Sequence, residues 1–376
     1  MSRPLSSPLR RTLTIQHAPA SPITTLSLIL PKRHQSTTTT ATTTSPPPKP
    51  SALSAADAAS SLLSRFQNQT RWETRLLDGN QLRNLSLTLG RRTLHPGVDV
   101  SARPPPNGTP LPPGYHLVYF TPGDVEADMG ADGTDATFNA PAPFTRRMWA
   151  GGRMRWINAG GTGGELRVGH EVLQKTWLVN AVPKRSRDGS EMVLVEVAKE
   201  IWAPGGLAIV DERSWIFRPE ATAASPAADM KLRDAVITGP STAKDVLEEG
   251  AAYPHRQLRW SPTGLFRFSA LTFNGHKIHY DPTWSAAVEG HPACVVHGPL
   301  NLICMLDYWR DFCAGGKGRR VREISYRAVA PVYAGETYEI SAEEGKEDGD
   351  VVTWDVLVNK EGKTCMTGHI VGGQED

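Results

Sequence analysis

Alternating apolar and polar residues dominate the chain from residue 147 onward, and this period of two predicts β-strands. Three long runs of this kind are EVLQKTWLVNAV, EMVLVEVAKEIW and LAIVDERSWIFR, and a shorter one, MRWI, precedes them. The segment SRDGS at 186–190 separates the first two runs, and Asp-Gly between alternating segments is a strong hairpin signal. We therefore expect an antiparallel sheet over this part of the chain.

The same order of strands returns in the last third of the sequence. GETYEISAEE, VVTWDVLVN and KTCMTGHIV alternate in the same way, and EDGD at 347–350 takes the place of SRDGS. Upstream of each group, FTRRMWAGGRMRW aligns loosely with KGRRVREISYRAV. The chain is thus predicted to hold a weak two-fold repeat, in which each copy is a curled antiparallel sheet.

The two copies differ in the segment that precedes the sheet. In the second copy, HGPLNLICMLDYWRDF at 297–312 has apolar residues on most sides of a helix, which predicts a buried helix. The first copy has only LPPGYHLVYF at 111–120, where Pro112 or Pro113 would sit in the first turn of a short helix. A buried helix wrapped by a long antiparallel sheet is the hotdog arrangement. The expected fold class is therefore α+β, a double hotdog of two sheets with a degenerate N-terminal copy.

Two short helices and an unusual leader are predicted ahead of the first sheet. SALSAADAASSLLSRFQNQ at 51–69 is amphipathic, and GNQLRNLSLTLG at 79–90 is also expected to be helical. Residues 1–56 hold no Asp or Glu but six Arg or Lys among many Ser and Thr, which is typical of a mitochondrial transit peptide. TTTTATTTSPPPKP at 37–50 has the composition of a disordered linker. We predict import into the mitochondrial matrix, and the alternative is a leader that is disordered without being a targeting signal.

Composition excludes several classes of partner. The formal net charge is +2 and the basic residues form no single stripe, so nothing indicates nucleic-acid binding. No run of about 18 apolar residues occurs, so we expect no membrane span. The four cysteines lack CxxC spacing, which favours reduced thiols in a non-oxidising compartment. They are Cys294, Cys304, Cys313 and Cys365.

Polar residues with chemical potential gather in FSALTFNGHKIHYD at 268–281 and in VVHGPL at 295–300. Zinc binds tetrahedral nitrogen and sulfur donors, and pairs at two-residue spacing can chelate from a tight turn. Against this, HKIHYD alternates, which would point its two histidines to opposite faces, and two prolines restrict the later donors. We therefore predict no metal and no cofactor. The donors of the alternative metal site are His276, His279, His291, Cys294 and His297.

An acid/base site is the hypothesis that we favour for the same residues. A helix that begins near Gly298 offers free backbone N–H groups and the positive end of its dipole to an oxyanion. A histidine beside it can remove a proton that a polarised carbonyl has acidified. A thioester fits, because its α-carbon is acidic and its oxygen needs stabilisation as an enolate. The alternative is that His279 and His297 are structural histidines bonded to backbone.

The loop and helix together resemble a known family. FSALTFNGHKIHYD followed by VVHGPLNLICML is similar to the hydratase loop and central helix of MaoC-like enoyl hydratases. More narrowly, the sequence resembles the type 2 hydroxyacyl-thioester dehydratases of fungal mitochondria and the related mesaconyl-CoA hydratases. RRMWAGGRMRW, PPGYHLVYF and VGHEV extend the resemblance over roughly residues 60–376. It implies a double hotdog that removes water reversibly from (3R)-3-hydroxyacyl thioesters to give trans-2-enoyl thioesters, a step of mitochondrial fatty acid synthesis.

The broad family carries a catalytic aspartate and histidine in this loop, and the present chain departs from that pattern. The histidine falls on His279, the aspartate position holds Asn274, and the asparagine position holds His276. Asn274 cannot exchange a proton at neutral pH. We predict His279 as principal base, Asn274 as an orienting group and the Gly298 N–H as the carbonyl anchor. Proton transfer then rests on His279 alone or is shared with His276 or Asp281, and the alternative for Asp281 is to cap a turn before Pro282.

Substrate choice depends on the shape of the pocket. The expected substrate-binding residues are Phe273, His297 and Arg267. An alternative function is hydration of a branched dicarboxyl CoA ester of the mesaconyl type, for which Arg267 and Lys277 are candidate cations. A second alternative is a catalytically inactive acyl-binding module, with Asn274 as the lost acid.

The expected organisation of the chain follows from these assignments. Residues 1–50 are predicted to be transit peptide and linker, 51–220 an N-terminal hotdog-like half, 221–255 a linker and 256–376 the C-terminal catalytic half. The expected partner is an acyl thioester of acyl carrier protein or CoA. Because one chain already holds two hotdog copies, a monomer or a homodimer is expected.

Overall fold

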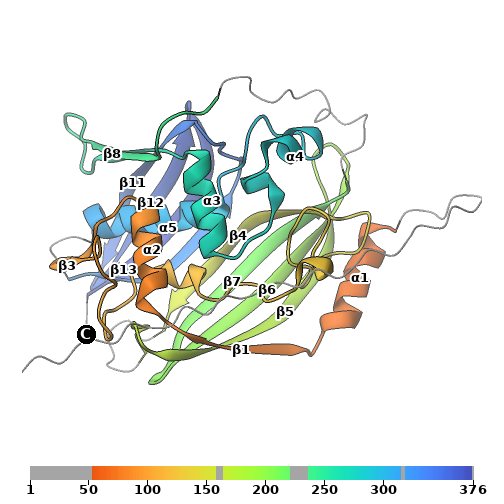
Figure 1. The fold of residues 1–376 in the computed structure, drawn as a ribbon, viewed down its shortest axis with the longest axis horizontal. Helices are drawn as coiled ribbons and strands as arrows, with labels where there is room; N and C mark the ends of the chain where they lie inside the picture. The colour runs from red at the N-terminus through yellow and green to blue at the C-terminus, as the bar shows by residue number, and fades with distance from the viewer. Residues whose placement is uncertain (1–52, 158–163, 221–235, 315–317, 375–376) are drawn as a thin grey trace, which may run out of the picture. The chain divides into compact units, whose positions relative to one another are not determined.

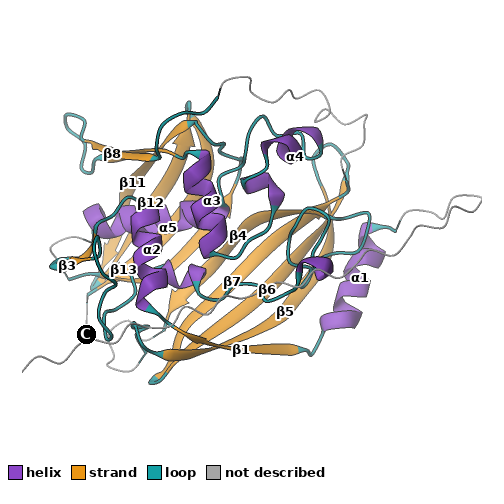
Figure 2. Cartoon of the chain, viewed as in Figure 1, coloured by secondary structure: helices purple, strands orange, loops and turns teal. Residues whose placement is uncertain are grey.

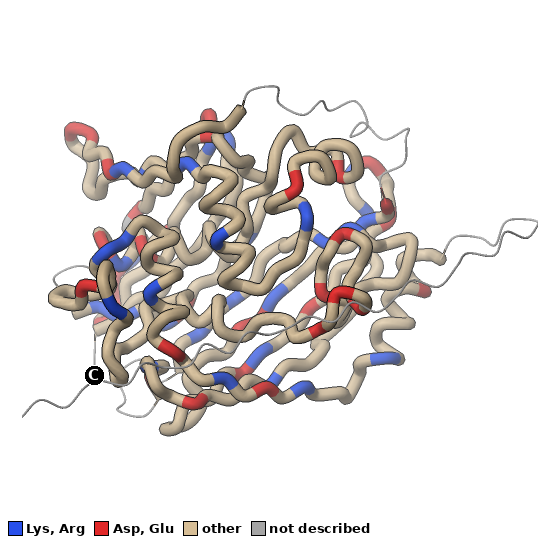
Figure 3. The backbone as a smooth tube through the Cα atoms, in the orientation of Figure 1, with Lys and Arg blue, Asp and Glu red and all other residues tan. Residues whose placement is uncertain are grey.

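The computed structural model describes residues 53–157, 164–220, 236–314 and 318–374. Residues 51–376 form one compact unit. The predicted transit peptide, and the part of the predicted linker at 221–235, lie outside the described residues. Within the described part of the chain, no helix is long and apolar enough to cross a bilayer. Figure 3 shows basic and acidic residues interspersed along the described chain, in keeping with the small net charge.

One eleven-stranded sheet forms the framework of the fold, and every neighbouring pair of strands in it is antiparallel (Figure 1). The two sheets of the expected double hotdog are thus joined edge to edge, through pairing of β4 with β10. In spatial order the strands are β1 (Thr70–Leu76), β5 (Glu171–Arg185), β6 (Glu191–Ala203), β7 (Gly206–Arg218), β4 (Arg146–Trp156), β10 (Arg320–Ala328), β13 (Lys363–Gly373), β12 (Val351–Lys360), β11 (Thr337–Asp348), β9 (His255–Arg259) and β8 (Thr242–Val246).

The predicted internal repeat is confirmed by the order of the strands. Reading outward from the β4–β10 junction, one side runs β4, β7, β6, β5 and the other runs β10, β13, β12, β11. These are the pairs that the sequence alignment matched. Both predicted hairpins are present, with Arg185 paired to Glu191 and Asp348 paired to Val351. Strand β8 lies inside the segment that was expected to be linker, and the proposed domain boundaries stay a prediction.

Helix α5 (Gly298–Tyr308) is the buried helix that the sequence predicts, and it continues as a π-helical turn over Trp309–Cys313. Every residue from Leu300 to Tyr308 is buried. Burial of each large apolar side chain contributes about 1.5–3 kcal/mol, so this helix anchors the C-terminal half. It packs against β12, and a side chain at Gly368 of β13 would contact Met305.

The N-terminal half has only a short helical turn where the C-terminal half has α5. LPPGYHLVYF forms the 3-10 turn η1 (Tyr115–Val118), which packs on α5 at Ile303 and Leu306 through Gly114. Helix α1 (Ala55–Phe66), capped by Ser54, packs on β5 and β6 of the N-terminal half. The N-terminal copy is therefore degenerate, as expected.

Most of the remaining helices and turns lie on one face of the sheet, the face turned toward the viewer in Figure 2. Helices α2 and α3 pack against each other there. The turn η4 replaces what was expected to be an extended HKIHYD segment at 276–281, so the predicted alternation is wrong at this place. These elements are α2 (Gly79–Thr88), α3 (Pro262–Leu271), α4 (Pro282–Ala287), the turns η2 (Glu126–Asp128) and η4 (Lys277–His279), and the small hairpin β2 (Thr93–His95) and β3 (Val98–Asp99).

Candidate active site

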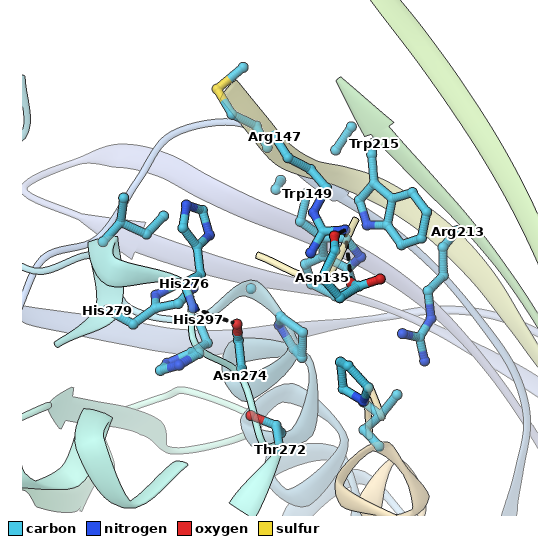
Figure 4. Close-up of a pocket in the computed structure, with 18 of the residues that line it drawn as sticks. Asp135, Arg147, Trp149, Arg213, Trp215, Thr272, Asn274, His276, His279 and His297 are labelled. Carbon is cyan, nitrogen blue, oxygen red and sulfur yellow. Dashed lines mark hydrogen bonds and ion pairs between the residues drawn. The ribbon is translucent and has the colours of Figure 1, made fainter. Parts of the chain in front are cut away.

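A cavity of about 980 Å³ lies between the loop that follows α3, the start of α5 and the inner face of β4 to β7. It therefore takes residues from both halves of the repeat. Figure 4 shows three histidines and Asn274 on one side of this space, with charged and aromatic residues of the N-terminal half across from them. The labelled residues on that far side are Asp135, Arg147, Trp149, Arg213 and Trp215.

Helix α3 and the turn behind it bring the loop to the cavity. The helix begins sharply, because the Ser261 side chain accepts a hydrogen bond from the Gly264 N–H and Pro262 suits the first turn. At its end Phe273 adopts a left-handed φ of 46°, a conformation that non-glycine residues rarely take. The Asn274 carboxamide oxygen then accepts a hydrogen bond from the His276 N–H at 3.0 Å (Figure 4). This local turn explains why HKIHYD is not a strand: Asn bonds its own backbone two residues on.

His279 lines the cavity with one ring nitrogen committed and the other available. Its Nδ1 lies 2.8 Å from the carbonyl oxygen of Val295, and a carbonyl can only accept, so Nδ1 carries the proton and Nε2 the lone pair. Burial lowers the pKa of His279 to about 4. The ring is therefore neutral at pH 7, which is the state that a general base requires.

Two further imidazoles pack on this ring. His297 stacks on His279 with ring centroids 3.6 Å apart, and His276 meets the same ring edge-on at 5.3 Å. Burial, and then the neighbouring histidines, hold the pKa values of His276 and His297 well below the usual range. Ser269 fixes His297 through a 2.9 Å contact between its hydroxyl and Nε2. All three rings line the cavity as neutral groups.

The start of α5 presents backbone donors to the same space. Gly298 is the first residue of the helix and lines the cavity, and the His297 side chain does not cap it. Among the described residues, no acceptor is bonded to the N–H groups of Gly298 and Leu300. A Cβ on Gly298 would overlap the indole of Trp149, so only glycine fits here. This arrangement can bind a carbonyl oxygen that becomes negative.

An acidic residue that the sequence analysis missed lies behind His276. A carboxylate oxygen of Asp132, Oδ2, is 3.5 Å from His276 Nε2, while Oδ1 accepts hydrogen bonds from the Thr134 N–H and hydroxyl. The Asp132 carbonyl also accepts from the Lys277 N–H at 2.8 Å. GADGTD at 130–135 gives no local sign that Asp132 contacts His276, because the two residues are 144 positions apart in sequence.

Close backbone packing holds the Asp132 segment against the loop that follows α3. Gly133 and Gly275 lie so near each other that a Cβ on Gly275 would be 2.7 Å from the Gly133 carbonyl oxygen. The approach of these two glycines is what brings Asp132 to His276.

Several of the site residues predicted from the sequence lie outside the cavity or at its exposed edge. Asp281 caps α4, accepting a hydrogen bond from the Trp284 N–H at 2.9 Å, and Arg267 points to solvent from α3; neither lines the cavity. Phe273 does line it, although 56% of its surface is exposed. Of the predicted metal donors, Cys294 does not line the cavity. Within the described ranges, no three His, Cys, Asp or Glu side chains form a metal-binding group.

Sequence comparison finds relatives that are named as dehydratases or hydratases of acyl thioesters. The sequence profile of the hydroxyacyl-thioester dehydratase type 2 family matches residues 114–334. The mesaconyl-C(4)-CoA hydratase of Chloroflexus aurantiacus is 30% identical over 239 residues, which are 61% of this chain and 75% of that protein. The mitochondrial hydroxyacyl-thioester dehydratase type 2 of Schizosaccharomyces pombe is 26% identical over 257 residues, covering 63% of this chain and 79% of that protein.

Solved structures support the fold. A MaoC-like dehydratase from Phytophthora capsici aligns with a TM-score of 0.54 at 14% identity, over 84% of this chain and 99% of that one. A second MaoC-like dehydratase aligns with a TM-score of 0.52 at 13% identity, over 84% and 100%. The profile match covers more than half of the 376 residues. The chain therefore belongs to the hydroxyacyl-thioester dehydratase type 2 family, with the MaoC-like hotdog fold, and is an enzyme of the hydro-lyase class.

Proposed function

We propose that the protein catalyses reversible dehydration of (3R)-3-hydroxyacyl thioesters to trans-2-enoyl thioesters, with His279 as principal base. The observation that carries this proposal is the pairing of a neutral imidazole, with its Nε2 lone pair available, and the unbonded N–H groups at the start of α5 in one cavity. Proton removal next to a carbonyl needs both a base and a donor to the oxygen.

The reaction proceeds in balanced steps. The thioester oxygen accepts a hydrogen bond from the Gly298 N–H, which acidifies the hydrogens on C2. His279 Nε2 takes one C2 proton and the electron pair forms the C2–C3 double bond as the C3–O bond breaks. The leaving hydroxyl receives a proton from the imidazolium and departs as water. A conjugate acid with a pKa of about 4 returns its proton readily, so the low pKa of His279 favours the second half of the cycle.

Asn274 and His276 assist this transfer. The Asn274 oxygen is occupied by the His276 N–H, which leaves the amide NH₂ to donate to the 3-hydroxyl or to water. His276 has the Asp132 carboxylate at its Nε2, and a carboxylate there favours the tautomer whose Nδ1 accepts a proton. Asp132 is thus proposed as a positioning residue that offsets the missing loop aspartate. Asp281 and Arg267 have no part in this scheme.

The proposed setting is the mitochondrial matrix, with acyl carrier protein or CoA as the carrier of the acyl group in fatty acid synthesis. Its support is the acid-free leader of the sequence and the mitochondrial name of the S. pombe relative.

The test is an assay of trans-2-butenoyl-CoA hydration with the wild type and His279→Ala. A general base contributes about 100- to 10,000-fold, so the variant should lose at least 100-fold in kcat. His369→Ala is the matched control, since His369 is half-exposed and paired with Asp355 outside the cavity. Full turnover by His279→Ala would remove the proposed base. A wild type that binds acyl-CoA without turnover would instead support the inactive acyl-binding module.

A second candidate function is hydration of a dicarboxyl CoA ester. The mesaconyl-C(4)-CoA hydratase relative supports it, and so does one feature of the cavity: lysine and arginine side chains of the N-terminal half line it.

A further inference from the structure

The cavity wall supplied by the N-terminal half carries charged and amide side chains among its apolar and aromatic ones. Gln174, Lys199 and Arg213 line it from the adjacent strands β5, β6 and β7. They share one face of the sheet, because Lys199 pairs with Thr176 on one side and Asp211 on the other. Strand alternation then turns all of these side chains toward the cavity.

The charges on this wall do not balance. Asp211 is fully buried and accepts from Arg213 Nε at 2.8 Å, so these two neutralise each other. Arg147, on β4, is likewise paired with Asp135 at 3.1 Å. Among the described residues, Lys199 makes no hydrogen bond or ion pair. A third carboxylate that acts on Lys199, Glu73 of β1, is paired with Arg75. Within the group of Lys199, Arg213 and Asp211, two cations therefore face one carboxylate and one positive charge is left over.

Leaving this charge unpaired inside the protein is unfavourable. Burial is the main cause that lowers the pKa of Lys199 to about 8, and Arg213 lowers it further. The ammonium is nonetheless the major form at pH 7. The Gln174 carboxamide is 2% exposed and its oxygen has no donor in the described structure. An anion in the cavity would pair with Lys199, and the Gln174 NH₂ could donate to it.

We propose that Lys199, with Gln174 and Arg213 beside it, forms a subsite for a carboxylate carried by the acyl group of the thioester. The inference rests on the proposed dehydration chemistry, and within it selects short acyl thioesters that end in a second carboxyl group over the uncharged acyl chains of fatty acid synthesis. An uncharged acyl chain would cover Lys199 with hydrocarbon and leave its charge unpaired, which costs more than the apolar contact returns.

The cations that sequence alone suggested for such a substrate are engaged elsewhere. Arg267 is exposed on α3, and Lys277 donates to the Ala131 carbonyl at 2.8 Å and lies over the Trp284 ring. Neither lines the cavity. The unpaired charge comes instead from the half of the repeat that lacks the catalytic loop.

A second anion of the substrate has to be distinguished, since CoA and phosphopantetheine carry phosphates. We would compare mesaconyl and trans-2-butenoyl groups, each as the CoA thioester and as the N-acetylcysteamine thioester, which has no phosphate. The variants are Lys199→Met and the charge-preserving Lys199→Arg. Lys175→Met is the matched control, because Lys175 is the neighbouring lysine on the other face of the sheet, paired with Glu200.

The expected result is a change of selectivity. In Lys199→Met the ratio of kcat/KM for mesaconyl over butenoyl groups falls about 10- to 100-fold, as for loss of a charged hydrogen bond, with both carriers. Lys199→Arg keeps most of the ratio, and Lys175→Met keeps the wild-type value. Melting temperature is measured alongside. It should not fall in Lys199→Met, because the variant removes an uncompensated, partly buried charge.

Three results would overturn the inference. Equal loss for both acyl groups on CoA, with N-acetylcysteamine thioesters spared, would assign Lys199 to a phosphate. Equal loss on every substrate with a lowered melting temperature would make Lys199 a structural partner of Asp211. An unchanged ratio in a stable variant would remove the subsite. The proposed function fails separately, if the wild type turns over neither acyl group or if His279→Ala keeps full activity.

Discussion

Replacing Gly298 by alanine adds one methyl group at the first residue of α5, where the structure leaves no room for it. The new Cβ would overlap Cε3 of the Trp149 ring and lie 2.8 Å from Cζ3 and 3.0 Å from Cδ2. Trp149 cannot simply turn away, because its ring packs on Tyr326 with centroids 4.8 Å apart. The helix start or the indole must therefore move.

The size of the effect follows from two opposing contributions to stability. Forcing a methyl group into a packed site costs about 1–3 kcal/mol. Exchanging glycine for alanine in a helix returns about 0.5–1 kcal/mol. We expect the free energy of unfolding to fall by up to about 2.5 kcal/mol net, measured by urea denaturation. Activity should suffer more, because a shift of about 1 Å in the carbonyl anchor can cost about 100-fold in rate.

A double-mutant cycle with Trp149→Leu tests the reasoning. If the clash is the cause, Gly298→Ala should cost little stability in the Trp149→Leu background, giving a coupling energy of at least about 1 kcal/mol. Additive losses of stability would show that the ring does not set the need for glycine. Hydration of butenoyl-CoA, followed in the same four proteins, separates loss of the anchor from loss of folding. Wild-type activity in a stable Gly298→Ala would refute the assignment of this N–H.

Three further predictions concern the histidines and the segment that contacts them. Asp132→Asn keeps the shape but removes the charge beside His276, so kcat should fall roughly tenfold, about 1.4 kcal/mol, with KM little changed; a wild-type kcat would exclude the positioning role. His116, His279 and His291 have pKa values lowered to about 4 by burial, against 6.5 when unfolded. Their contribution to stability is thus full above pH 6.5 and is lost as pH falls to about 4, which urea titrations at pH 7, 5.5 and 4.5 would follow; stability that rises on acidification contradicts it. Gly275→Ala places a Cβ 2.7 Å from the Gly133 carbonyl, so activity should drop while Gly123→Ala, whose Cβ meets nothing, stays near wild type.

The fold was largely predictable because its signals are local. Alternation with a period of two reports which strand face is buried, so the four strands of each copy and their hairpins could be read from the sequence. The same holds for α5, whose apolar residues surround the helix. HKIHYD shows where this fails: its alternation is real, but the Asn274 side chain stabilises a turn that overrides it. Helix α3 was missed for a different reason, because its apolar run is too short to identify by period.

The sequence by itself determined the family, the repeated strands, the buried helix and the group of histidines in one loop. It also identified Gly298 as the start of a helix beside them. Only the tertiary structure decided which partners those residues have. Asp132 reaches His276, and Lys199 faces the cavity, through contacts between segments far apart in the chain, and no local pattern encodes such distances. Whether a charge is paired, as for Arg213, or left over, as for Lys199, depends on that packing and therefore appears only in three dimensions.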